Sequence, residues 1–120
     1  MKLAVTAKKD SLDSEVDPKF GRCAYFLLVD TESMDYESVK NSSKSARGGA
    51  GVQAAETLSK NDADALATGN VGPNAYNALS SAGIETFTGA KGTVREAVED
   101  CVSGELMEAN EPTTSGGANK

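Results

Sequence analysis

The chain has 120 residues, the size of one ordinary domain, and its 12 basic and 18 acidic residues give a net charge of −6 at pH 7. This acidic balance argues against nucleic-acid and anionic-membrane partners, because a basic surface supplies most of the affinity for either. No apolar run approaches the ~20 residues of a membrane-spanning helix, and Lys8 to Asp10 interrupt the apolar start too early for a signal peptide, so we expect a cytoplasmic protein.

Three strands are predicted in the first third of the chain. Residues 3–6 form a short apolar run, and residues 24–30 form a longer one with the composition of a strand buried on both faces. Residues 34–40 alternate more loosely after a turn-like segment at 30–33. The three strands together predict a meander.

Helices and strands alternate in the rest of the chain. The pattern predicts a helix at 51–60, a strand at 65–68, a helix from Pro73 to a stop at Gly83, a strand at 84–88 and a helix that starts with the capping box Thr93-Val94-Arg95-Glu96. Residues 107–120 show no periodicity, so we expect a single α/β domain over 1–106 and a disordered tail over 107–120.

This order of elements predicts an α/β fold with three layers, in which helices cover both faces of a mixed five-stranded sheet. Right-handed crossovers make the fourth and fifth strands parallel to the first, and only the second strand is antiparallel. The carboxyl ends of the four parallel strands therefore share one edge of the sheet, and all three helices begin at that edge.

Each of these helices follows a glycine-rich loop, at 48–51, 69–72 and 89–92, and the loop at 17–22 reaches the same edge. Helix N-termini leave backbone N–H donors without partners, and glycine lets a ligand approach them closely. Taken as residues 7–22, 42–50, 69–74 and 88–93, the loops at this edge also hold seven of the 12 basic residues but only four of the 18 acidic ones. The sequence therefore predicts a site for an anion at this edge, where ligands of open α/β sheets bind.

Other readings of these loops stay open. Glycine before a helix is often required only by the geometry of the loop. None of the loops has the Walker or the Gly-x-Gly-x-x-Gly pattern, but a phosphate- or nucleotide-binding module could use the same donors. A domain that docks a partner protein through these loops is a third possibility.

The chain has no histidine and two cysteines, Cys23 and Cys101, which excludes a tetrahedral Cys/His metal site within one chain and any Ser-His or Cys-His catalytic pair. Cys101 lies in the apolar stripe of the last helix, so we expect it in the core. Cys23 lies between the Arg22 loop and a buried strand, and it is a candidate either for the core or for a metal ligand.

Four segments resemble a known family: VDPKFGRCAYFLLVD at 16–30, GGAGVQAAETL at 48–58, TGNVGPNAYNALSSAGI at 68–84 and GTVREAVE at 92–99. They are similar to the dinitrogenase iron–molybdenum cofactor biosynthesis family, which includes nitrogenase cofactor carriers and cluster-binding orange proteins. The resemblance spans residues 1–106 and implies a ribonuclease-H-like motif with strand order 3-2-1-4-5. It also implies a non-enzymatic carrier of an anionic iron–sulfur or molybdenum-containing cluster, with cluster donor and acceptor proteins as partners.

Some relatives carry histidine or cysteine in the loop before the first helix, where this chain has neither, so we expect amides, Arg22 and Arg47 to hold the cluster. No acidic residue lies in the first strand or at the start of the second helix, so the carboxylates that hold metal ions in ribonuclease-H-like nucleases are missing, and we expect no catalytic residues. The oligomeric state stays open. The expected cluster-binding residues are Phe20, Gly21, Arg22, Arg47, Gly48, Gly49, Gly51, Gly69, Asn70, Gly72, Pro73, Asn74, Gly89, Gly92 and Thr93.

Overall fold

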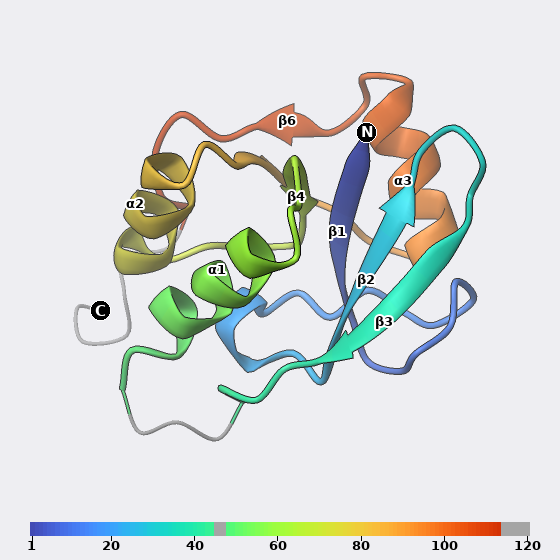
Figure 1. Ribbon diagram of the computed structural model, residues 1–120. Helices are drawn as coiled ribbons and strands as arrows, with labels where there is room; N and C mark the ends of the chain where they lie inside the picture. Colours follow the sequence, from blue (N-terminus) through green and yellow to red (C-terminus); the bar gives the residue numbers. More distant parts are fainter. Residues whose placement is uncertain (45–47, 114–120) are drawn as a thin grey trace.

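The structure is a computed structural model that describes residues 1–44 and 48–113. From β1 to α3, strands and helices follow one another along the chain as expected (Figure 1). The strands are β1 (Lys2–Ala7), β2 (Tyr25–Asp30), β3 (Tyr36–Lys40), β4 (Ala65–Ala67), β5 (Glu85–Thr88) and β6 (Met107–Glu108). The helices are α1 (Ala50–Lys60), α2 (Pro73–Ser81) and α3 (Val94–Val102), with the 3-10 turn η1 (Phe20–Arg22) before β2.

In the described part of the chain, one mixed sheet joins six strands in the order β3-β2-β1-β4-β5-β6. β2 is antiparallel to β1 and β3, whereas β1, β4 and β5 are parallel, which confirms the predicted order 3-2-1-4-5. The carboxyl ends of β1, β4 and β5 therefore lie at one edge, next to the starts of the helices.

Strand alternation divides the core into two clusters, one on each face of the sheet. Leu3 and Val5 of β1 pack with Val94 and Val98 of α3. Ala4, which points the opposite way, belongs to the cluster that contains residues of α1 and α2. Helices α1 and α2 thus lie together on one face and α3 lies on the other, as Figure 1 shows.

Two expectations from the sequence were wrong: the number of strands, and the lack of structure at the start of the tail. Met107–Glu108 forms a sixth strand, antiparallel to β5, and Ala109 N donates to Thr86 O at 2.8 Å. Residues 107–113 have defined positions, and residues 114–120 lie outside the described part of the chain. Backbone hydrogen bonds hold this segment and both residues of β6 have exposed side chains, so no apolar pattern marks it in the sequence.

Candidate functional site

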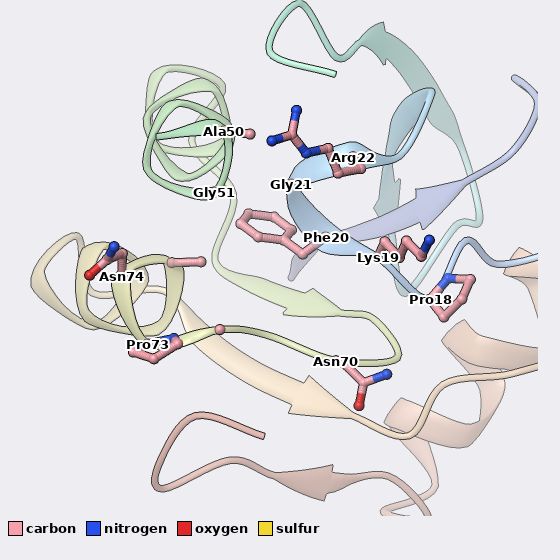
Figure 2. A pocket seen from close by; sticks show the side chains of 12 residues that line it. Pro18, Lys19, Phe20, Gly21, Arg22, Ala50, Gly51, Asn70, Pro73 and Asn74 are labelled. Carbon is pink, nitrogen blue, oxygen red and sulfur yellow. The ribbon is translucent and has the colours of Figure 1, made fainter. Parts of the chain in front are cut away.

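A cavity of about 620 Å³ opens where α1, α2 and η1 meet, at the carboxyl edge of the sheet. Figure 2 shows η1 beside the starts of both helices, with the ring of Phe20 directed between them. The residues that line the cavity come from three segments far apart in the sequence: Pro18, Lys19, Phe20, Gly21, Arg22, Ala50, Gly51, Asn70, Gly72, Pro73, Asn74 and Ala75.

Hydrogen bonds to the ends of β1 and β4 fix the loop that carries η1. Asp17 N donates to Thr6 O at 2.9 Å, and the buried Thr6 hydroxyl donates back to Asp17 O at 2.6 Å. The same hydroxyl lies 2.8 Å from that of Thr68 on the neighbouring chain segment. Asn70 N donates to Pro18 O at 3.0 Å, which ties the loop before α2 to the loop before η1.

Two glycines let η1 and the two helices approach closely enough to form the cavity wall. A Cβ atom on Gly21 would lie 2.9 Å from the backbone nitrogen of Gly51, and one on Gly51 would lie 2.8 Å from the Cβ of Ala75. Any side chain at either position would push these segments apart. Gly21 and Gly51, which lie in the segments that resemble the family, are therefore needed for close packing, whether or not they also contact a ligand.

The starts of α1 and α2 both face the cavity without a side-chain cap among the described residues. The first intrahelical bonds are donated by Gln53 N to Gly49 O and by Tyr76 N to Gly72 O. The N–H groups of Gly51 and Ala75 precede those bonds, so neither has an acceptor within its own helix. Such donors, at the positive ends of two helix dipoles, can hold an anion.

The charge of the lining residues has the same sign as these helix ends. Lys19 and Arg22 line the cavity, and within residues 1–44 and 48–113 no aspartate or glutamate does, in a chain whose net charge is −6. Arg22 donates from Nη1 to Lys44 O at 3.0 Å, and this bond directs its guanidinium toward the start of α1 (Figure 2). Arg47 lies outside the described residues.

The start of α3 lies at the same edge but is closed by the protein itself. Glu96 N donates to Thr93 Oγ1 and Thr93 N donates to the Glu96 carboxylate, which completes the predicted capping box. Val94 N donates to Ser14 O and Arg95 N donates to Leu12 O, both at 2.9 Å. These four amides are therefore occupied within the protein.

The expected site residues thus fall into groups. Eight of them line the cavity: Phe20, Gly21, Arg22, Gly51, Asn70, Gly72, Pro73 and Asn74. Gly48, Gly49 and Gly69 belong to the loops that lead into the lining segments but do not line the cavity themselves. Gly89, Gly92 and Thr93 do not line it either, because they belong to the closed start of α3.

Four lining residues were absent from the expected set, namely Pro18, Lys19, Ala50 and Ala75. Pro18 and Lys19 lie in the same Pro-x-Phe-Gly-Arg motif as Arg22, so the motif itself was the signal for them. Ala50 and Ala75 are small residues in the first turns of α1 and α2, and only the structure shows that they face the cavity.

Cys23 lies in the core beneath this site and has no exposed surface. Its thiol donates to Phe20 O at 3.3 Å, and burial, with a smaller contribution from the charge of Asp17, raises its pKa to about 12. Metal ligation requires the thiolate, which this environment disfavours. Among the described residues, no group of three or more His, Cys, Asp or Glu side chains could hold a metal ion.

Comparisons with known proteins identify the family and the fold of the chain. The family model for the dinitrogenase iron-molybdenum cofactor matches residues 1–104. The apo form of the orange protein from Desulfovibrio gigas is 43% identical, with a TM-score of 0.92 over 94% of this chain and 96% of that chain. A Thermotoga protein of the DUF35 family is 33% identical, with a TM-score of 0.82 over 96% and 98% of the two chains.

An uncharacterized protein of Methanocaldococcus jannaschii is 26% identical over 97 residues, which cover 78% of this chain and 82% of that protein. Within the described part of the chain, no helix is long and apolar enough to cross a membrane. The matched residues include η1, the loops before α1 and α2, and the whole cavity lining. The chain therefore belongs to the dinitrogenase iron-molybdenum cofactor family.

Proposed function

We propose that the protein is a non-enzymatic carrier that binds an anionic metal–sulfur cluster, iron–sulfur or molybdenum-containing, as cargo in the cavity between α1 and α2. The observation that carries this proposal is the donor set. Among the described residues, two helix starts without a side-chain cap, together with Lys19 and Arg22, line one cavity that no aspartate or glutamate lines, in an acidic protein. Membership of a family named for the dinitrogenase iron-molybdenum cofactor supports the choice of cargo.

The apolar part of the lining supports a sulfide-rich anion over a phosphate. Phe20, Pro18 and Pro73 contribute carbon surface next to the amides and cations. Phosphate oxygens are strongly hydrated and lose much of that hydration beside carbon. Cluster sulfides carry more diffuse charge and accept hydrogen bonds from backbone amides. A cavity of about 620 Å³ is also within the range of small-molecule sites.

Hydrogen bonds and charge, rather than side-chain ligation, hold the cargo in this proposal. The raised pKa of Cys23 and the lack of a ligating group of three or more His, Cys, Asp or Glu among the described residues support that view. A cluster held without covalent ligands can be received and released intact, which suits a carrier. Its partners would be cluster donor and acceptor proteins, and its place of work the cytoplasm.

Anaerobic reconstitution tests the proposal. The protein is incubated with iron, sulfide and molybdate, and metal and sulfide content and visible absorption are measured after desalting. We expect uptake by the wild type. Arg22→Ala should weaken binding about ten- to a hundredfold, because a charged hydrogen bond contributes about 1.5–3 kcal/mol. Arg95→Ala is the matched control, since Arg95 lies on the closed helix α3 and pairs with Asp13 at 3.4 Å.

Two results would contradict the proposal. The first is a wild type that takes up no metal or sulfide yet binds phosphate or a nucleotide at the same amides. That result would favour the phosphate- or nucleotide-binding module. The second is equal loss of uptake in Arg22→Ala and Arg95→Ala, which would mean that the cavity is not the binding site.

A further inference from the structure

The chain beyond α3 crosses the molecule from one helix layer to the other. It pairs with β5 as β6 and then passes over α2, as the red end of the ribbon in Figure 1 shows. Ala109 N donates to Thr86 O at 2.8 Å, and the Tyr76 hydroxyl donates to Ala109 O at 3.4 Å. We call residues 107–113 the C-terminal strap.

Thr113 of the strap contacts the loop that lines the cavity. Thr113 N donates to Val71 O at 2.9 Å, and Val71 N donates to Thr113 Oγ1 at 2.8 Å. Val71 is 2% exposed and packs in the apolar cluster of α1 and α2. Its two neighbours in the chain, Asn70 and Gly72, both line the cavity. Thr113 thus hydrogen-bonds the loop backbone at Val71, the residue between two positions that line the cavity.

Hydrogen bonds rather than apolar burial hold the strap. Met107 is 76% exposed, and most other strap side chains are exposed or only partly covered. A second cavity of about 270 Å³, lined by Tyr76, Ile84 and Ala109 among others, lies beside it between α2 and β5. Segments with few buried apolar contacts open at low free-energy cost, so the strap can detach while the domain stays folded.

We propose that Thr113 is a positioning residue: docking of the strap holds loop 69–72 in the conformation that lines the cavity, so strap docking and cargo binding stabilise each other. This inference rests on the proposed function for its cargo. Coupling between two binding events is reciprocal, so release of the strap lowers cargo affinity and bound cargo tightens the strap. The strap is then the element through which cargo can be discharged without unfolding.

The first test measures affinity for tetrathiomolybdate, a soluble molybdenum–sulfide dianion, by anaerobic titration of the full chain. Thr113→Val removes the hydroxyl that accepts from Val71, and Ala109→Pro removes the strap amide that donates to Thr86. Each should weaken binding about two- to tenfold, the range of one neutral hydrogen bond. Thr57→Val is the control, because its hydroxyl bonds only its own helix, at Gln53 O. Its affinity should equal that of the wild type.

The second test is amide hydrogen exchange, which separates positioning from general stability. Saturation with tetrathiomolybdate should slow exchange at Thr113 and Ala109, which lie outside the cavity lining. Without any ligand, Thr113→Val should speed exchange at Asn70, whose amide donates to Pro18 O, while the melting temperature stays near that of Thr57→Val. This arm stands even if the wild type binds no tetrathiomolybdate, a result that would count against the proposed function alone.

Unchanged hydrogen exchange at Asn70 in Thr113→Val would overturn the inference, since the strap would then not hold the loop. Wild-type affinity in both strap variants would overturn it as well. The inference would also be overturned if bound tetrathiomolybdate did not change hydrogen exchange at Thr113 and Ala109, because coupling between two binding events is reciprocal.

Discussion

The helix starts at the carboxyl edge differ in what satisfies their amides. At α3, Thr93, Glu96 and two backbone carbonyls accept all four of the hydrogen bonds that an N-terminus has to offer. At α1 and α2, glycine stands at the N-cap and the described residues provide no side-chain cap. Three loops with similar composition therefore have two different roles: one only begins a helix, and two leave donors directed at a cavity.

The largest expected effect is on the pH dependence of the free energy of unfolding, which should differ between the cysteines on the two faces of the sheet. Burial raises the pKa of Cys23 to about 12, from an ordinary value of 9.0. Above pH 9 the unfolded chain loses the Cys23 proton and the folded chain keeps it. The contribution of Cys23 to the free energy of unfolding is therefore fully present below pH 9, and it is lost as the pH rises toward 12. The slope should approach about 1.4 kcal/mol per pH unit.

Cys23→Ala should remove most of that slope in urea unfolding measured between pH 8 and 11. Cys101 is half-buried on α3, where burial also raises its pKa, and Cys101→Ala should remove less. Equal slopes in wild type and Cys23→Ala would show that the thiol beneath the cavity ionises freely.

Close packing of the loops on the cavity side predicts the next effect. A Cβ on Gly69 would lie 2.7 Å from the Cα of Pro18, so Gly69→Ala must separate two backbone segments. We expect a loss of about 1–3 kcal/mol in the free energy of unfolding. Gly48→Ala, where nothing lies within 4 Å of the added Cβ, is the control and should change stability little. Equal stabilities would mean that the loops can move apart at no cost.

Adding a side-chain cap to an open helix start tests whether the free amides of that start bind the cargo. Gly72 is the N-cap of α2 with φ −86° and ψ 175°, the extended conformation that aspartate adopts as a cap. Gly72→Asp should occupy the amides of α2, add a negative charge to the cavity and weaken tetrathiomolybdate binding at least about tenfold. Gly72→Ala controls for the added Cβ. Undiminished binding by the aspartate variant would exclude α2 as a donor.

The smallest effect is expected at the closed start. Thr93→Ala removes the cap of α3 and should cost about 1 kcal/mol of stability, measured by chemical denaturation. Uptake of the metal–sulfur cargo should not change, because Thr93 does not line the cavity. A variant that folds normally but loses its cargo would place the site at α3.

The sequence predicted the layers, the strand order and the edge of the sheet, because alternation and crossover handedness determine those features. The glycines alone could not show which of the three glycine-rich loops leave backbone donors open to the cavity. The sequence showed the capping box at Thr93 and Glu96. It did not show that the carbonyls of Ser14 and Leu12 accept from the other two N-terminal amides of α3, which leaves that helix start without a donor. The strap was missed because backbone bonds hold it and leave no apolar pattern in the sequence.

The most direct measurement is an anaerobic amide NMR titration of the full chain with tetrathiomolybdate. We predict saturable shifts at the amides of Gly51, Asn74 and Ala75, which begin the two open helices, and unchanged signals at Val94 and Arg95. Inorganic phosphate at the same concentration should shift these amides far less. Shifts centred on Val94 and Arg95, or equal shifts with phosphate, would contradict the claim that the open helix starts form a site for a metal–sulfur anion.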